Sequence, residues 1–395
     1  DWSSDVCSSD LEMWDIRLHL QENESEYPDV AASSNGLLHM TYLICAEVLK
    51  VMEDARGQLE GHVLLINLQT LSISRHSFLP DPLCYVCSKL PDDSPTTAKI
   101  SLQPSPKVAP NNYRSRAMKE LSEFLTTDYL DQRMGFLNNK MIDLVPPFAD
   151  VSVTLPLFVG DEGAAGRTNS YAVSELTAIL EGLERYCGME PRGKRTVIHD
   201  SYNNLKHLAL NPHEVGVHSR EQYEQPGFPF NPFDPNRPIK WVWGYSFLQE
   251  RAILVPEILA HYSLGCGEGF VYETSNGCAL GGSLEEAIFY GIMEVVERDS
   301  FLLTWYAQLA LPRLDPYSTN DEELQLMIER ARAVAGYDIH LYNATMENGI
   351  PSVWALAKNN KQEGLNIICA AGAHLDPIRA VKSAVHELAG MMLTL

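Results

Sequence analysis

Two stretches of the chain, Ile179-Leu-Glu-Gly-Leu-Glu-Arg185 and Ile292-Met-Glu-Val-Val-Glu-Arg298, carry the same acidic signature, E-x-x-E-R. Apolar residues fill the positions around the acids, which is typical of a helix with a substantially buried face. Residues three and four apart share one face of a helix, so each copy points two carboxylates and an arginine the same way. The sequence therefore predicts two buried helices that offer four carboxylates to one site.

Four carboxylates in one buried site need a cation to hold them together. Hard oxygen ligands select Mg²⁺, which keeps several waters and bridges a few carboxylates to substrate phosphates. The alternative is a solvated helix face with ion pairs four residues apart, which is the usual origin of a single copy of the signature. The apolar surroundings favour a magnesium site made of Glu181, Glu184, Glu294 and Glu297.

The composition excludes several classes of protein. The net charge of −22 and the lack of any Lys/Arg-rich run exclude a nucleic-acid partner. No stretch approaches the ~18 apolar residues of a membrane span, and no secretory pattern opens the chain. The eight cysteines are scattered and do not form a disulfide framework. We expect a cytoplasmic protein without a membrane partner.

Both ends of the chain have unusual sequence. Residues 1–11 resemble translated sequencing-adapter sequence and are expected to be non-native. Residues 380–395 have the pattern of an uninterrupted helix without a stop signal. We therefore expect a chain that is open at both ends, and truncated at its C-terminus.

The hydrophobic pattern divides the remainder into two domains. A helix over Gly36–Leu49 and a strand over Gly61–Leu68 are typical of the tail of an α/β unit, within a first domain of residues 12–90. Residues 91–112 are rich in Ser, Pro and Asn and are predicted to be a linker. The second domain is expected to span residues 113–395.

Two glycine-containing stretches, Gly163–Ser170 and Ser275–Gly282, precede the acidic helices and are predicted to be loops. Glycine lets backbone N–H groups reach an anion, and the N-terminus of a helix adds a favourable dipole. Neither stretch matches the P-loop or the Rossmann pattern, so the sequence does not support either of those folds.

From residue 113 onward the sequence resembles the YcaO domain. The first motif of that family places a basic residue, a serine and a hydroxyl residue at fixed distances before the first helix carboxylate, and Arg167, Ser170 and Thr177 stand there ahead of Glu181. The second motif, N-x-x-A-x-G-x4-E-A-x7-E-x-x-E-R, is matched by Asn276, Ala279, Gly281, Glu286, Ala287, Glu294, Glu297 and Arg298.

This resemblance implies an α+β fold with a mixed sheet, in which the E-x-x-E-R helices hold Mg²⁺ against the phosphates of ATP. It implies metal binding by all four glutamates, and catalytic contact with phosphate by Arg167 and Arg298, whose planar groups match phosphate oxygens. Ser170, Thr177, Asn276 and Glu286 would line the nucleotide pocket together with both arginines. Arg185 could equally face phosphate or pair with its neighbouring acids.

Two of these assignments have plain alternatives. Asn276 could be a turn residue in the left-handed conformation. Glu286 could be an acid of the first helical turn, where it stabilises the helix dipole.

Residues 12–90 resemble the end of the ThiF-like domain that is fused to YcaO in the biosynthesis of thiazole/oxazole-modified peptides. The pattern His76-x5-Pro-Leu-Cys84-x-x-Cys87 carries this likeness. Cys84 and Cys87 would be half of a structural zinc site, because a zinc tetrathiolate needs a second thiolate pair, expected upstream. The alternative is a pair of buried, inert thiols.

The fused family implies an enzyme of bacteriocin biosynthesis. It catalyses ATP-dependent cyclodehydration of Cys, Ser and Thr in a ribosomal precursor peptide, and phosphorylation activates the amide oxygen. The alternatives are amide activation for another nucleophile, as in thioamidation, and a scaffold that only binds the precursor. A flavin-dependent dehydrogenase partner and a homodimer stay open. Cyclodehydrating members end in a Pro-rich tail that this chain lacks, so we expect the chain to be inactive or severely impaired.

Overall fold

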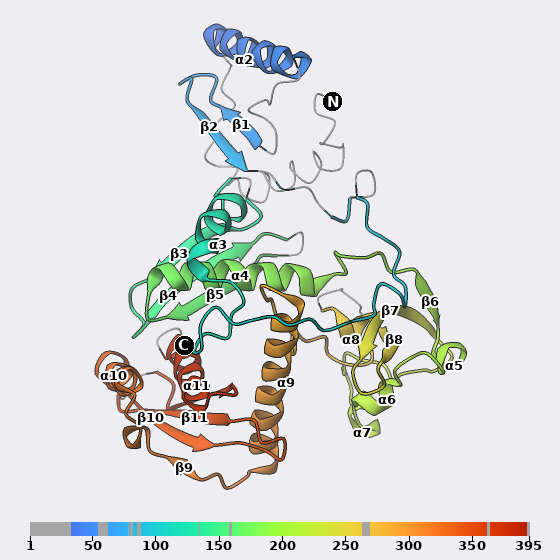
Figure 1. Ribbon diagram of the computed structural model, residues 1–395, viewed down its shortest axis with the longest axis vertical. Coiled ribbons are helices and arrows are strands. Elements are labelled where there is room, and N and C mark those ends of the chain that lie inside the picture. Colours follow the sequence, from blue (N-terminus) through green and yellow to red (C-terminus); the bar gives the residue numbers. More distant parts are fainter. Residues whose placement is uncertain are drawn as a thin grey trace. The chain divides into compact units, whose positions relative to one another are not determined.

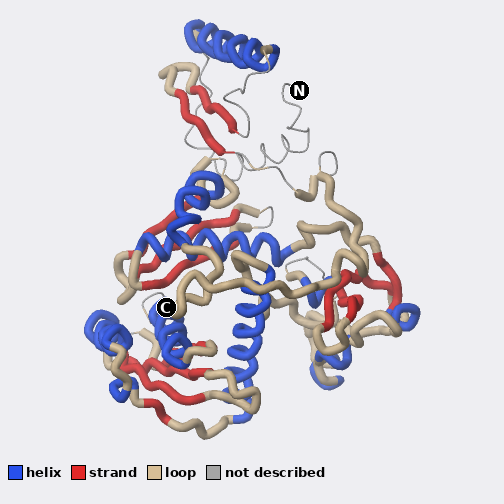
Figure 2. Tube along the Cα trace, viewed as in Figure 1, coloured by secondary structure: helices blue, strands red, loops and turns tan. Residues whose placement is uncertain are grey.

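A computed structural model describes residues 33–53, 62–77, 79, 82–84, 88–133, 135–157, 160–262, 269–361 and 364–392. The chain folds into two compact units, of residues 1–88, 116–182 and 389–395, and of residues 89–115 and 183–388 (Figure 1). Residues 1–11 lie outside the described part. Helices and several antiparallel sheets confirm the α+β class, and Figure 2 shows the strands in separate sheets.

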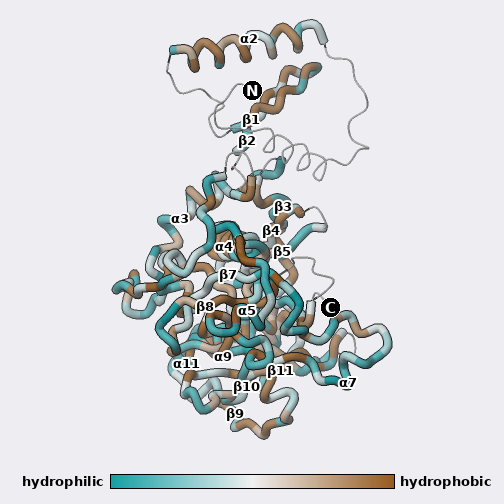
Figure 3. The backbone as a smooth tube through the Cα atoms, turned by 90° about the vertical axis from the view of Figure 1, so that its right-hand side faces the viewer, coloured by the Kyte–Doolittle hydropathy of each residue, from teal (hydrophilic) through white to brown (hydrophobic). Residues whose placement is uncertain are grey.

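The first unit contains a hairpin with a helix and a three-stranded sheet. The predicted helix and strand near its start are present as α2 and β1. The elements are α2 (Ser34–Met52), β1 (His62–Ile66), β2 (Ile73–Ser77), α3 (Met118–Phe124), the π-helical turn Leu125–Tyr129, β3 (Asn138–Asp143), β4 (Ala149–Leu155), β5 (Glu162–Thr168) and most of α4 (Tyr171–Met189). Figure 3 shows that α2 is largely hydrophobic, and several of its apolar side chains, including Leu38 and Met52, are exposed.

The glycine-rich stretch before α4 is a strand, and the expectation of a loop there is wrong. Residues 162–168 pair in register with β4 along the whole of β5. Gly166 has no room for a side chain, because a Cβ atom would meet the backbone of Ser174 and the side chain of Thr177. The glycine is therefore needed so that α4 can pack closely against β5.

The second unit begins with the three-stranded sheet β6-β7-β8. Its elements are β6 (Ile198–Ser201), α5 (Tyr202–Leu205), α6 (Pro212–Val215), α7 (Arg220–Tyr223), β7 (Pro238–Ser246), β8 (Arg251–Pro256) and α8 (Glu257–Ala260). Trp241, Trp243 and Leu254 form its core. Residues 91–112, which the sequence predicts to be a linker, belong to this unit. Within them, Asp93 is buried, accepts a hydrogen bond from Trp243 N (2.6 Å) and pairs with Lys194 (3.0 Å).

The same unit contains a four-stranded antiparallel sheet in the order β12-β11-β10-β9. Its elements are α9 (Leu284–Ala307), β9 (Arg313–Leu314), the 3-10 turn Pro316–Ser318, α10 (Glu322–Arg330), the π-helical turn Ala331–Ala335, β10 (Tyr337–Asn343), β11 (Ser352–Asn359), β12 (Ile367–Ala373) and α11 (Pro377–Met391). Helix α9 packs on β11 and β12. Helix α11 packs on β12, where a Cβ atom at Gly372 would meet the backbone of Ala380. Among the described residues, no helix has the length and hydrophobicity needed to cross a bilayer.

Candidate functional site

The two glutamates of the E-x-x-E-R motif in α4, Glu181 and Glu184, are held by backbone N–H groups. Glu181 accepts a hydrogen bond from Ala165 N of β5 (2.7 Å). Glu184, one turn later, accepts a hydrogen bond from Leu280 N (3.2 Å) in the predicted loop Ser275–Gly282. That stretch is irregular in the structure, and Gly277 has a φ of +87°, which favours glycine. The first E-x-x-E-R helix therefore reaches both glycine-containing stretches that precede the acidic helices.

The second E-x-x-E-R helix, α9, holds its acids beside one arginine. The side chains of Glu294 and Glu297 are 25% and 17% exposed, and Arg298 Nη2 lies 3.6 Å and 4.0 Å from their Oε1 atoms. The expected burial of the apolar residues around these acids is only partly observed, because Ile292 and Val295 are about half exposed. The acids of α9 are thus more buried than some of the apolar residues around them.

The pKa values of Glu297 and Cys278 are shifted by burial and by the negative charges of neighbouring carboxylates. Burial raises the pKa of Glu297 to about 7; Arg298 opposes the shift, while Glu387 and Glu294 add to it. Burial also raises the pKa of the Cys278 thiol to about 11, and the negative charges of Glu184 and Glu294 contribute. Carboxylates from α4 and α9 therefore act on the same residue of the Ser275–Gly282 loop.

Glu294 and Glu297 are partly buried and share a single half-exposed arginine, so their negative charge is not fully balanced. A hard cation would balance it. Among the described residues, no three His, Cys, Asp or Glu side chains already converge as a metal site. Mg²⁺ commonly keeps several waters and is shared between one or two carboxylates and substrate phosphates. Carboxylates spread along two helices fit that kind of site better than a cage made by protein alone.

The first-motif residues lie at the junction of β5 and α4. Arg167 Nε donates to Asp150 Oδ2 at 2.7 Å, and a Cβ atom at Gly390 would meet the Arg167 side chain. The Ser170 carbonyl accepts a hydrogen bond from Thr168 Oγ1 (2.9 Å). Thr177 Oγ1 donates to Val173 O within α4 (2.9 Å). Arg167 is thus held by an ion pair.

Asn276 and Glu286 differ strongly in their surroundings. Asn276 is exposed, and its backbone N–H lies 3.4 Å from Thr274 Oγ1. Glu286 is buried and accepts hydrogen bonds from Arg114 Nη1 (3.0 Å), Ser115 N (2.8 Å), Ser115 Oγ (2.6 Å) and Gly282 N (3.1 Å). Burial raises the pKa of Glu286, but the hydrogen bonds from Ser115 and Arg114 outweigh it, so the pKa is lowered overall. Glu286 therefore ties residues 114 and 115 to the start of α9.

The Ser275–Gly282 loop and the first half of α9 line a shallow, open pocket of about 460 Å³. Gly277 and Gly291 allow a close approach, because a Cβ atom at Gly291 would meet Gly277 O at 2.7 Å. The lining consists of small and apolar residues: Gly277, Ala279, Ala287, Ile288, Gly291, Ile292, Val295 and Val296. Its surface suits a flat, uncharged group such as a nucleotide base.

Three basic residues near Glu286 were not predicted from the sequence. The cationic groups of Lys107 and Arg379 lie over the ring of Tyr113, at 4.2 Å and 5.7 Å from its centre. Arg114 lies over the ring of Tyr290, at 4.1 Å. Lys107 and Arg114 lie seven residues apart and form no recognised motif, and Arg379 is more than 260 residues further along the chain, so the fold is needed to bring the three positive charges together.

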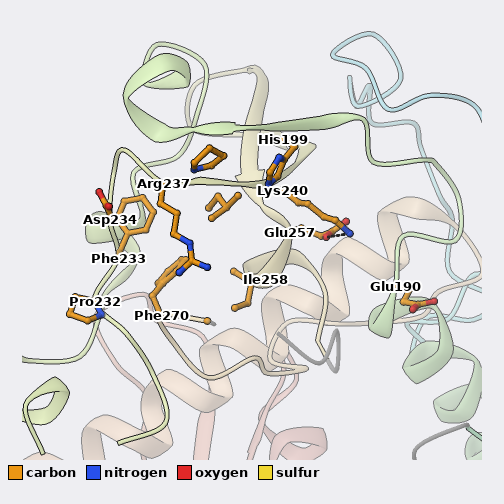
Figure 4. A pocket seen from close by; sticks show the side chains of 13 residues that line it. Glu190, His199, Pro232, Phe233, Asp234, Arg237, Lys240, Glu257, Ile258 and Phe270 are labelled. Atoms are coloured by element: carbon orange, nitrogen blue, oxygen red, sulfur yellow. Dashed lines mark ion pairs between the residues drawn. The ribbon is translucent and has the colours of Figure 1, made fainter. Parts of the chain in front are cut away.

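A separate pocket of about 400 Å³ lies at the β6-β7-β8 sheet (Figure 4). Arg237 points into it beside Phe270 and Ile258, and Lys240 forms an ion pair with Glu257 (3.6 Å). None of the residues predicted to bind ATP or Mg²⁺ lines this pocket. It is therefore distinct from the acidic helices.

The structure gives no support for zinc. Cys84 is buried, and Cys87 lies outside the described residues. In the described ranges no group of metal-binding side chains surrounds Cys84.

Known proteins resemble this chain in sequence and in fold. A family described as YcaO cyclodehydratase, ATP- and Mg²⁺-binding, matches residues 165–395. An uncharacterised protein encoded in the tfuA 3′ region of Rhizobium leguminosarum bv. trifolii is 33% identical over 174 residues, which cover 40% of each chain. The chain thus spans less than half the length of this relative.

Two solved structures are similar in fold. A heterocyclase in complex with substrate and cofactor is 21% identical, with a TM-score of 0.77 over 95% of this chain and 56% of that one. YcaO from Methanopyrus kandleri, bound with AMPPCP and Mg²⁺, is 22% identical, with a TM-score of 0.54 over 71% of this chain and 68% of that one. At these identities the likeness shows the fold.

Proposed function

The chain belongs to the YcaO cyclodehydratase family, and we propose that it uses ATP and Mg²⁺ to cyclise Cys, Ser or Thr residues of a ribosomal precursor peptide. The convergence of Glu184 and Glu294 carries the proposal. They come from the two E-x-x-E-R helices, and both influence Cys278 in the Ser275–Gly282 loop. An acidic pair beside a glycine-containing loop suits Mg²⁺ and phosphate.

Each motif residue has a role in this proposal. Glu181, Glu184, Glu294 and Glu297 hold Mg²⁺, which neutralises phosphoryl charge when bound. Arg298, half exposed beside two of these acids, binds phosphate, and Arg167 is oriented for the same task by Asp150. We assign contacts with the bound nucleotide to Ser170, Thr177 and Asn276, although none of the three lines the apolar pocket beside α9. Glu286 contributes by fixing Arg114 and Ser115.

The proposed reaction converts an amide into a better electrophile. The thiol or hydroxyl of a Cys, Ser or Thr attacks the carbonyl carbon of the preceding amide. The former amide oxygen takes the γ-phosphoryl group of ATP, and the C–O bond then breaks to release phosphate. A thiazoline or oxazoline and ADP are formed, and Arg298 and Arg167 stabilise the charge on the transferred group.

Other parts of the proposal concern the rest of the protein. We propose that α2, β1 and β2 derive from a ThiF-like domain, and that the protein works in the cytoplasm. Oxidation of the product by a flavin-dependent dehydrogenase, and assembly into a homodimer, stay predictions.

Mass spectrometry of a Cys- and Ser-containing peptide library, incubated with the chain, ATP and Mg²⁺, tests the reaction. In a chain extended by the Pro-rich tail expected for cyclodehydrating members, we expect loss of one water per modified residue and release of phosphate. The Glu294→Gln variant of that extended chain should leave the peptide mass unchanged and release no phosphate. Exchange of oxygen for sulfur, when sulfide is supplied, would indicate thioamidation. Bound but unmodified peptides with intact ATP would indicate a precursor-binding scaffold.

A further inference from the structure

A third pocket, of about 450 Å³, lies where the end of α9 meets β10 and β11. Its walls are aromatic and aliphatic, and none of its lining residues is Asp, Glu, Lys or Arg: Thr304, Trp305, Gln308, Leu309, Leu311, Tyr342 and Trp354. Tyr342 and Trp354 are register partners on neighbouring strands, so they point to the same face of the sheet. The lining therefore favours an uncharged, hydrophobic ligand.

Two polar groups in this pocket are buried and unpaired. Thr304 is 7% exposed, and both its Oγ1 atom and the Nε1 atom of Trp354 lack a hydrogen-bond partner among the described residues. A buried polar atom without a partner costs free energy, so native proteins rarely retain one without a reason. The indole N–H only donates, and the threonine hydroxyl can donate or accept. A peptide group, with one C=O and one N–H, can satisfy both.

The pocket lies on the same side of α9 as the acidic site. Thr304 follows Glu297 by two helical turns, so the two side chains share a face about 10 Å apart along the axis. A peptide that is modified near Glu297 would extend along this face toward the end of the helix. Trp305 and Leu309, which are 57% and 42% exposed, leave the mouth of the pocket apolar.

We propose that this pocket binds the precursor peptide next to the residue being modified, and takes a hydrophobic side chain together with its backbone amide. The inference rests on the proposed function, since it assigns part of the substrate of the same enzyme. Trp354 Nε1 donates to the peptide carbonyl, and Thr304 Oγ1 accepts from the peptide N–H. The aromatic walls select aliphatic or aromatic residues and disfavour charged ones.

Two conservative variants test the assignment. Thr304→Val and Trp354→Phe each remove one unpaired polar group and keep most of the side-chain volume. We expect the unfolding midpoint to stay the same or rise, because the loss of an unpaired buried group costs nothing. We expect binding of acetyl-Leu-Phe-Cys-methylamide, measured by ligand-observed NMR, to weaken about five- to tenfold, the effect of one hydrogen bond.

Three controls separate the outcomes. Tyr306→Ala changes an exposed neighbour that does not line the pocket, and should leave peptide binding unchanged. Acetyl-Asp-Glu-Cys-methylamide should bind more weakly than the hydrophobic peptide. Mg²⁺-dependent ATP binding is measured in the same samples. If the parent chain does not bind ATP, the proposed function is contradicted, but the peptide-binding test of the pocket still stands.

Equal peptide affinity in the parent chain and in both variants would overturn the assignment. The pocket would instead be an interface between copies of the chain if sedimentation showed a dimer that Trp305→Ala dissociates, with no change in peptide affinity.

Discussion

At the scale of single residues, Glu297 has a strongly perturbed carboxyl group. Burial, with Glu387 and Glu294, raises its pKa from 4.5 to about 7 despite Arg298. The folded protein therefore binds a proton here that the unfolded chain has lost, and stability falls as the pH rises from about 4.5 to about 7.

Replacing this acid should separate stability from metal binding. Above pH 7 the Glu297→Gln variant should be more stable than the parent, with a free energy of unfolding that is about 2–3 kcal/mol higher. The reason is that the variant no longer carries a buried charge. The same variant should lose Mg²⁺-dependent ATP binding. Urea unfolding at pH 5 and pH 8 without metal measures the first effect. An identical pH dependence in both proteins would show that Glu297 is not perturbed.

Glu286 is expected to behave in the opposite way. Because the pKa of Glu286 is lowered in the folded protein, its carboxylate stabilises the fold at pH values above 4.5, the ordinary pKa of a glutamate. This stabilisation is lost as the pH falls below 4.5. Glu286→Ala removes the acceptor of four hydrogen bonds and should lower the unfolding free energy by about 3 kcal/mol.

The matched control for this change is Glu285→Ala. Glu285 is the adjacent acid, and its exposed side chain accepts a hydrogen bond from Gln103 N (2.7 Å). Its loss should leave the thermal midpoint nearly unchanged. Equal destabilisation by the two variants would show that a general effect of charge at the start of α9, and not the buried hydrogen bonds, explains the result.

At the scale of elements, β5 supplies the closest packing in the site. A methyl group at Gly166 would collide with Ser174 O, so Gly166→Ala should push α4 away from β5 and cost about 1–3 kcal/mol. Gly163→Ala, in the same strand, has nothing within 4 Å and should change stability little. Thermal unfolding of both variants checks this, and a larger loss for Gly163→Ala would contradict the packing argument.

The same strand shows where sequence patterns mislead. The acidic signatures correctly predicted that two helices carry the glutamates, because apolar periodicity and acid spacing are local properties. The Gly163–Ser170 stretch was predicted to be a loop because it contains glycines and other small residues. Its strand conformation depends on pairing with β4 and on the approach of α4, which are contacts with distant residues.

At the scale of the whole molecule, the proposed site draws on residues from more than one motif. The E-x-x-E-R glutamates and Arg298 were predicted from sequence. Lys107, Arg114 and Arg379 were not, because two come from a segment without hydrophobic period and the third from α11. The pocket at Thr304 and Trp354 was not predicted either. It forms only where the end of α9 meets a strand, and these elements are distant in the sequence.

The central claim is that carboxylates on α4 and α9 hold Mg²⁺ and thereby ATP. It is tested most directly by calorimetric titration of ATP, with and without Mg²⁺, into the parent chain and two variants. Glu184→Gln removes a proposed ligand, whereas Glu175→Gln changes an acid of α4 that pairs with Lys140 (3.0 Å) outside the motif.

We predict Mg²⁺-dependent binding in the parent and in Glu175→Gln, and binding weaker by about tenfold or more in Glu184→Gln. Equal ATP affinity in all three folded proteins, or binding that ignores Mg²⁺, would contradict the account.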